Sequence, residues 1–304
     1  MKKNNNTNSK KAGPIQFNDS DELLDIRYDN IFKAVFTKDT PNSRGALSGL
    51  ISALIKRKVT VQTIIANEPP AESVFNRNIR FDIACKAKTG EFINIEMTFY
   101  PESYELERLE YFASRQFSGQ NIKGIDKDYS DLKETYQIAI LGKERFFSDE
   151  VLVHTFHYFD SVNSVSLPGK IRIITLELLK AESIVSKPIN KMGIQEAWSV
   201  FFQYLTDCDK REIINEILQK EAEIKMASET LIEISRDEIE RARLTSELKY
   251  ILDNQSMRVS AKREGEKIGF KKGEKKGKKE IIDMLISGKP PQEIIKEYKA
   301  GNSK

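Results

Sequence analysis

Apolar positions along the chain follow two periods, and the change between them outlines an α/β domain. Between Leu23 and Lys58 they recur every three or four residues, which predicts helices with a break at residues 40–42. From Val59 they alternate, which predicts strands at 59–65, 79–85 and 92–99. The same signals predict a helix at 104–118 and later strands at 135–141, 153–159 and 171–178.

Past Lys191 the pattern is helical. Residues 209–254 carry apolar positions at helical spacing without a strict heptad, which favours a helical hairpin or arm over a coiled coil. Glycines then recur every four residues, at 265, 269, 273 and 277. Because each glycine inside a helix costs about 1 kcal/mol relative to alanine, a stable isolated helix is not expected there. Two interpretations stay open: a solvated linker, or a basic segment that orders on nucleic acid or on a partner helix.

These patterns predict four parts. Residues 1–20, rich in Asn, Lys and Ser, are expected to form a disordered basic tail. Residues 21–182 form the α/β domain, and a helical region at 190–256 follows. Residues 257–304 form a basic, glycine-periodic tail with short terminal helices. The helical parts also suggest a homo-oligomer formed through the C-terminal helices.

Charge is distributed unevenly, although the 304-residue chain has a net charge of only +3. Residues 258–279 contain ten Lys and Arg against three Glu, and the first 14 residues add four lysines, so the remaining body is net acidic. Basic ends on an acidic body favour contacts with the phosphates of DNA. The chain has two cysteines far apart, no apolar run near the ~18 residues of a membrane span and no secretory signal. These features predict a cytoplasmic protein with no membrane contact.

The strands at 79–85 and 92–99 carry the candidate chemistry. A three-residue loop, Lys88-Thr89-Gly90, has its glycine where a left-handed backbone is needed, and it sets Ala87 opposite Glu91. The same register brings Asp82 opposite Glu96. It makes one face of the hairpin apolar, whereas the other face carries Asp82, Ala84, Asn94, Glu96 and Thr98.

Two carboxylates that face each other across a hairpin repel unless a cation or a shared proton compensates. A hard divalent cation such as Mg²⁺ suits these oxygen ligands and holds waters that act as nucleophiles. The alternative from geometry alone is a solvent-facing sheet surface with two unrelated acids. His154 and His157, the two histidines, lie three apart in a predicted strand and therefore face opposite sides, which disfavours a zinc site.

Several short motifs follow one another in an informative order. Tyr28-Asp-Asn-Ile-Phe-Lys33 precedes the strands, Arg80-Phe-Asp82 and Asn94-Ile-Glu-Met97 lie on them, and Arg108 and Tyr111 follow on the next helix. In this order the chain resembles the PD-(D/E)XK nuclease superfamily, and more narrowly the recombination-promoting nuclease (Rpn) and transposase family of bacteria. The resemblance covers residues 25–180 and the glycine-periodic tail. It implies a PD-(D/E)XK restriction-endonuclease-like core with a mixed sheet, followed by an all-helical C-terminal region.

The resemblance implies a metal-dependent DNA endonuclease of the recombination-promoting type, with Asp82 and Glu96 as ligands of Mg²⁺ or Mn²⁺. Two positions after the glutamate, such proteins have Lys or Gln to orient the attacking water. Here this residue is Thr98, which brings a hydroxyl and no charge. Lys33 is a candidate to supply the missing charge. The alternative is a catalytically inactive protein of the same fold that acts as a DNA- or protein-binding module, which Thr98 favours and the intact pair of acids disfavours.

Overall fold

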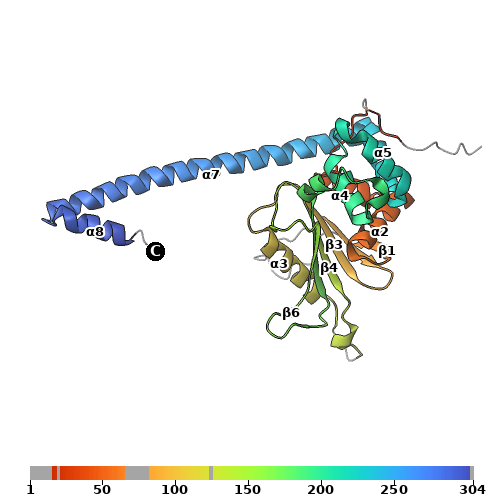
Figure 1. Cartoon of the computed structure of the whole chain (residues 1–304), viewed down its shortest axis with the longest axis horizontal. Helices are drawn as coiled ribbons and strands as arrows, with labels where there is room; N and C mark the ends of the chain where they lie inside the picture. The colour runs from red at the N-terminus through yellow and green to blue at the C-terminus, as the bar shows by residue number, and fades with distance from the viewer. Residues whose placement is uncertain (1–15, 19–20, 66–81, 123–125, 302–304) are drawn as a thin grey trace, which may run out of the picture. The chain divides into compact units, whose positions relative to one another are not determined.

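The computed structural model describes residues 16–18, 21–65, 82–122 and 126–301, in two compact units that divide after Leu244. A six-stranded sheet forms the centre of the first unit (Figure 1). Its strands are β1 (Val61–Ile65), β2 (Ile83–Ala87), β3 (Phe92–Thr98), β4 (Thr135–Leu141), β8 (Ile171–Glu177) and β5 (Val153–Phe156), in this spatial order. The central strands β3, β4 and β8 are parallel, and the other pairs are antiparallel.

The alternating pattern predicted these strands well. The segment predicted at 79–85 is described only from Asp82 onward, because residues 66–81 lie outside the described part of the chain. The strand predicted at 153–159 ends earlier, at Phe156. A separate hairpin of β6 (Phe159–Asp160) and β7 (Val165–Ser166) follows it. Two-residue strands are too short to produce an alternating pattern, so the sequence did not reveal this hairpin.

The helices around the sheet begin and end where the sequence favours it. Helix α1 (Asp29–Thr37) and helix α2 (Pro41–Ile55) are separated at the predicted break. Pro41 occupies the first turn of α2, and the side chain of Thr40 accepts a hydrogen bond from the amide of Ser43. Helix α3 (Glu105–Ser118) connects the parallel strands β3 and β4, and its Leu109 packs against β4 in one apolar cluster.

Further helices complete the first unit. They are α4 (Ile194–Tyr204), α5 (Arg211–Lys220), α6 (Ala222–Arg236) and the short turns η1 (Tyr129–Asp131), η2 (Leu178–Ser183), η3 (Ile189–Lys191) and η4 (Cys208–Lys210). An aromatic cluster joins α4 to α1, with ring centres 4.7–6.3 Å apart among Phe32, Phe36, Trp198 and Phe202. Apolar packing thus unites these helices with the sheet in one unit.

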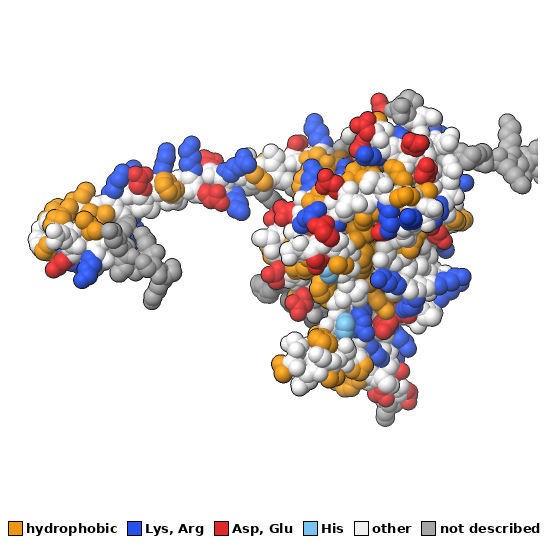
Figure 2. Space-filling model, viewed as in Figure 1, with side chains coloured by type: hydrophobic (Ala, Val, Ile, Leu, Met, Phe, Trp, Pro, Cys, Tyr) orange, Lys and Arg blue, Asp and Glu red, His pale blue; other side chains and the backbone are white. Residues whose placement is uncertain are grey.

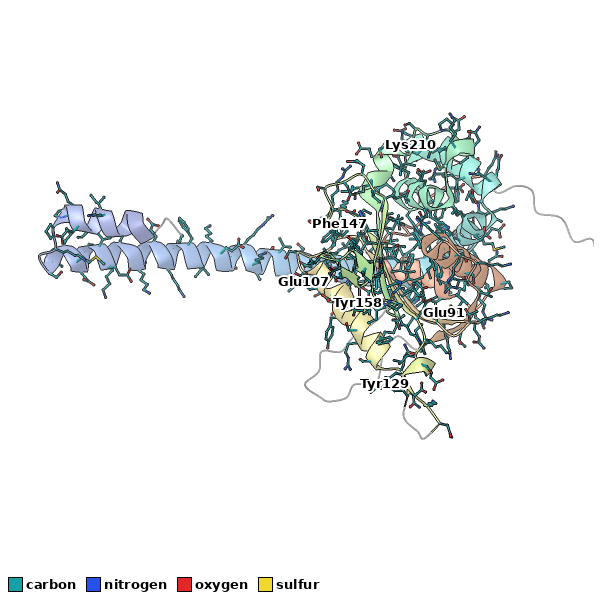
Figure 3. All side chains as sticks on the ribbon, turned by 60° about the horizontal axis from the view of Figure 1, so that its bottom comes forward. Glu91, Glu107, Tyr129, Phe147, Tyr158 and Lys210 are labelled. Atoms are coloured by element: carbon teal, nitrogen blue, oxygen red, sulfur yellow. The ribbon has the colours of Figure 1, made fainter. Side chains whose placement is uncertain are left out.

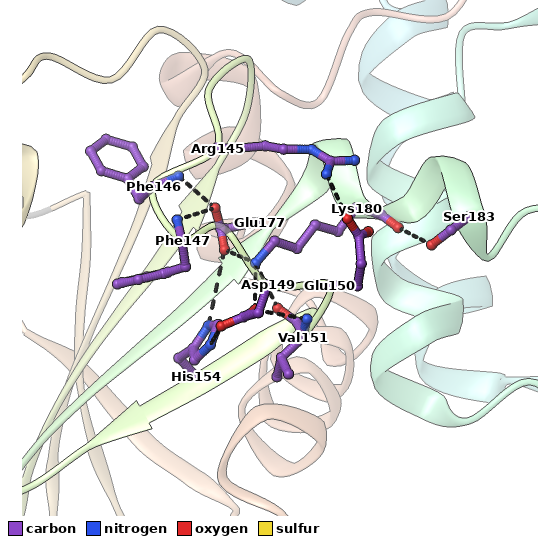
Figure 4. Close-up of polar contacts among 10 residues, drawn as sticks. All are labelled: Arg145, Phe146, Phe147, Asp149, Glu150, Val151, His154, Glu177, Lys180 and Ser183. Atoms are coloured by element: carbon purple, nitrogen blue, oxygen red, sulfur yellow. Dashed lines mark hydrogen bonds and ion pairs between the residues drawn. The ribbon is translucent and has the colours of Figure 1, made fainter.

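A buried polar network fixes the loop between β4 and β5 (Figure 4). Lys180 lies 2.5 Å from the carboxylate of Glu177, and both side chains have an exposed fraction of 0%. The ammonium group also contacts Asp149 at 3.1 Å and the carbonyl of Val151 at 2.9 Å. The amide of Phe146 donates to the other oxygen of Glu177 at 2.7 Å. The loop is therefore held by charge-assisted contacts with the end of β8.

The second unit begins inside α7 (Glu238–Ile286), one continuous helix that runs through all four periodic glycines. The sequence did not lead us to expect a helix here. The residues between the glycines are mostly Lys and Glu, which are strong helix formers. Ion pairs at i,i+4 stabilise the helix further, such as Glu274–Lys278 at 2.6 Å.

A Schellman-type turn ends α7 before α8 (Pro291–Gly301). Gly288 has φ 85°, and the amide of Lys289 donates to the carbonyl of Met284 at 3.2 Å. Figure 2 shows Lys and Arg side chains along α7 and hydrophobic side chains gathered around this turn. No helix in the described part of the chain is long and apolar enough to cross a membrane.

Two glycines on α2 allow α6 to approach closely. A Cβ atom on Gly49 would lie 2.3 Å from Cβ of Glu223. We expect Gly49→Ala to lower the free energy of unfolding by ~1–3 kcal/mol in urea denaturation, because the two helices must move apart. Gly269→Ala in α7 is the matched control, since a Cβ atom there meets nothing within 4 Å. Equal unfolding midpoints for Gly49→Ala and the wild type would contradict this account.

Candidate active site

The hairpin of β2 and β3 has the register predicted from its loop. Ile83 faces Ile95, Cys85 faces Ile93, and Gly90 has φ 101°. Asp82 directly precedes β2, so this register continues to Glu96.

The amide of Met97 donates to Oδ2 of Asp82 at 3.1 Å, which fixes the aspartate against β3. The side chain of Glu96 is 2% exposed and that of Asp82 is 17% exposed. The two acids therefore do not lie on a solvent-facing surface, as the alternative interpretation assumed.

Helix α3 supplies the groups that contact Glu96 and Thr98. Nη2 of Arg108 lies 3.1 Å from Oε2 of Glu96 and donates to the hydroxyl of Thr98 at 3.1 Å. The same guanidinium donates to Oε1 of Glu105 at 2.5 Å, and this carboxylate is also only 2% exposed. Because Glu105 and Arg108 lie one helical turn apart, they share the face of α3 that covers the site. A positive charge thus lies beside Thr98.

Helix α1 brings Lys33 to the other carboxylate. Its ammonium lies 3.0 Å from Oδ1 of Asp82 and 3.8 Å from Oδ2 of Asp29. Burial raises the pKa of Asp82, and the charge of Lys33 opposes that rise. Burial also acts to lower the pKa of Lys33. The charge of Asp82 and its hydrogen bond, together with the charges of Asp29 and Glu96, outweigh burial, so the pKa is raised. The contact therefore favours the charged form of both groups.

The pKa of Glu96 is also raised. Burial raises its pKa to about 8, the charge of Arg108 acts in the opposite direction, and the charge of Asp82 adds to the rise. The amide of Asn94 donates to Oε1 at 3.1 Å, whereas the buried Oε2 accepts no hydrogen bond. A buried carboxylate oxygen with one ion-pair contact and no hydrogen bond is well placed to bind a cation.

The chemistry of these side chains fits a divalent metal ion. Carboxylate oxygens are the ligands that Mg²⁺ and Mn²⁺ prefer, and Asp82 and Glu96 bring them from neighbouring strands. Among the residues that the structure describes, no group of three or more His, Cys, Asp and Glu side chains is arranged to hold a metal. Two carboxylates and several waters are sufficient for Mg²⁺, which dehydrates reluctantly.

The structure distributes the four predicted site residues over two contacts. Lys33 pairs with Asp82, and Thr98 lies with Glu96 near Arg108, so the cation that contacts Thr98 is Arg108 and not Lys33. Sequence reasoning missed Glu105. Its i,i+3 spacing from Arg108 on a predicted helix was the available signal, but a glutamate at a helix start is usually solvent-exposed.

The fold and this pair of acids together define a nuclease fold of the PD-(D/E)XK type. The mixed sheet, the hairpin with Asp82 and Glu96 and the crossover helix α3 are its parts. Residues 26–261 match the family described as PD-(D/E)XK nuclease family transposase, and the chain belongs to this family. The predicted core with an all-helical C-terminal region is confirmed. No curated protein and no solved structure matches the chain.

Proposed function

We propose that the protein is a metal-dependent DNA endonuclease of the recombination-promoting type that hydrolyses phosphodiester bonds with Mg²⁺ or Mn²⁺. The observation that supports this most is the buried pair of Asp82 and Glu96, each facing one cation. Burying two acids together costs free energy, and a stable core does not require it. Perturbed carboxyls of this kind are common where catalysis needs them.

Each side chain then has a role that follows from its contacts. Asp82 and Glu96 hold the metal, and the chemistry that a bound divalent ion supplies is an activated water and neutralised phosphate charge. Lys33, 3.0 Å from Asp82, favours the ionised form of that ligand. Arg108 places a positive charge where the family has Lys or Gln, and the hydroxyl of Thr98 positions its guanidinium.

The charge of α7 supports DNA as the partner. Its segment 258–279 is strongly basic, and phosphate contacts from Lys and Arg provide affinity without sequence preference. Homo-oligomer formation through the C-terminal helices stays a prediction. Exposed apolar side chains near the turn between α7 and α8 support it, namely Ile282, Leu285, Ile286 and Ile295.

The test is cleavage of a supercoiled plasmid in Mg²⁺ or Mn²⁺. We expect the wild type to cut, and Asp82→Asn and Glu96→Gln each to reduce cutting to the level of a protein-free control, because an amide is a poor metal ligand. Glu107→Gln is the matched control. It lies on the same helix α3 but is solvent-exposed, so cutting should be unchanged.

Retained folding is part of the same test. Because burial raises the pKa of Glu96 from 4.5 to about 8, the metal-free wild type loses stability as the pH rises from 4.5 through 8. Glutamine mimics the protonated acid, so Glu96→Gln should unfold no earlier than the wild type at pH 8. If both Asp82→Asn and Glu96→Gln still cut DNA, the active site lies elsewhere in the protein. A wild type that binds DNA and never cuts would favour the inactive binding module.

A further inference from the structure

A rigid aromatic platform follows directly on the strand that carries Glu96 and Thr98. Phe99 and Tyr100 form a bend directly after β3. Residues at the end of β4 fix the backbone before Tyr100: the amide of Gly142 donates to the carbonyl of Thr98 and that of Lys143 to the carbonyl of Phe99, both at 2.9 Å. A Cβ atom on Gly142 would lie 2.5 Å from this carbonyl oxygen of Phe99, so the close approach requires glycine.

The two rings differ in exposure although they are in contact. Their centres lie 4.7 Å apart, yet Phe99 is 7% exposed and Tyr100 is 45% exposed. Phe99 is covered by the guanidinium of Arg27 at 4.6 Å and by the edge of Tyr28 at 5.2 Å. It therefore forms the buried base on which the exposed ring of Tyr100 rests.

A cation fixes the exposed ring in place. Nζ of Lys143 donates to the hydroxyl of Tyr100 at 3.2 Å and lies 5.0 Å from the centre of its ring. Lys143 is itself solvent-exposed. Two residues after Thr98, the site thus offers an aromatic surface of low conformational entropy beside a solvent-exposed positive charge. Stacked bases and the phosphates between them need this combination.

A second exposed ring lies at the start of α3. Tyr104, which is 53% exposed, directly precedes Glu105, the residue that contacts Arg108 beside Thr98. In duplex DNA the faces of the bases are covered by their neighbours, so an aromatic platform is useful only for unpaired nucleotides.

We propose that Tyr100 stacks on an unpaired base next to the scissile phosphate, and that single-stranded DNA is the substrate class of this nuclease. The inference rests on the proposed function for the cutting step. The platform binds DNA without metal, so it can be tested separately. Tyr100 fixes the strand, Lys143 contacts its backbone, and the phosphate beside the stacked base reaches Asp82 and Glu96.

The experiment measures binding of a labelled single-stranded oligodeoxynucleotide and of its duplex to the full chain in EDTA. We expect Tyr100→Ala to weaken single-strand binding roughly five- to hundredfold, because stacking on an aromatic ring contributes that much per base. Duplex binding should change little. Tyr100→Phe keeps the ring but loses the hydroxyl that accepts from Lys143, so it should retain most of the wild-type affinity for the single strand. A 2-aminopurine base in the oligonucleotide should lose fluorescence on binding to the wild type and not to Tyr100→Ala.

Tyr129 provides the matched control. Its side chain is more exposed than that of Tyr100, at 79%. Glu107 lies near one end of α3, and Tyr129 lies past the opposite end (Figure 3). Tyr129→Ala should bind like the wild type. The proposal is overturned if the wild type does not bind the single strand, if Tyr100→Ala binds it like Tyr129→Ala, or if duplex binding falls equally. If neither the plasmid nor the single-stranded oligonucleotide is cut in Mg²⁺ or Mn²⁺, but binding depends on Tyr100, the proposed endonuclease is refuted and the platform stays in place.

Discussion

Replacing Lys180 by methionine is expected to lower the free energy of unfolding by ~3–5 kcal/mol, as measured by urea denaturation, because it leaves a buried charge without its partner. Lys180 and Glu177 are fully buried and 2.5 Å apart, and Asp149 and Val151 are further partners of the ammonium. Methionine matches the length of the lysine stem but carries no charge. The carboxylate of Glu177 would then face only backbone amides and His154.

Two companion variants separate this explanation from a general loss of packing. Lys180→Met with Glu177→Gln should recover most of the loss, because no uncompensated charge remains and the amide of Phe146 keeps an acceptor. Arg145→Met is the surface control. It breaks the ion pair of Arg145 with Glu150, in which the two side chains are 42% and 65% exposed, and it should lower the free energy of unfolding by at most ~1 kcal/mol. If the double variant is as unstable as Lys180→Met alone, the loss does not come from the unpaired charge.

Local signals were sufficient to predict the hairpin that carries the acids. A glycine at the third position of its loop and alternating apolar residues both specify one register, and the structure has that register from Ile83 to Lys86. The strands at 135–141 and 171–178 were predicted nearly to the residue because each is a short run rich in isoleucine and leucine.

Contacts between distant segments could not be predicted in this way. Lys180 and Glu177 resemble surface residues in the sequence, and only the pairing of β5 with β8 and the loop before β5 bury them. Glu105 is buried where α3, which connects β3 to β4, packs against β4 and β8, and no local pattern shows this packing. The continuous helix α7 differs for another reason: the propensity of its Lys and Glu residues outweighs the cost of the glycines.

Loss of the guanidinium of Arg108 is expected to lower the cleavage rate by ~10²–10³, as is common when a donor that stabilises the transition state is removed. Arg108 is the cation that contacts both Glu96 and Thr98. We expect this loss for Arg108→Met in single-turnover cleavage with saturating metal. Arg108→Lys should retain more activity because it keeps the charge, although it lacks the planar fork that contacts three partners.

The pH dependence distinguishes this role from a structural one. The charge of Arg108 lowers the pKa of Glu96, which burial raises to about 8. Without Arg108 that pKa rises further, and since a carboxyl must lose its proton to bind metal, the acid limb of the rate profile should move to higher pH. Thr98→Ala, which removes a hydroxyl and no charge, should leave the limb in place. Arg108→Met also leaves the buried Glu105 without its cation, so thermal unfolding is compared with the double variant Arg108→Met and Glu105→Gln. If the stable double variant cuts at the wild-type rate with an unshifted limb, Arg108 only balances the charge of Glu105.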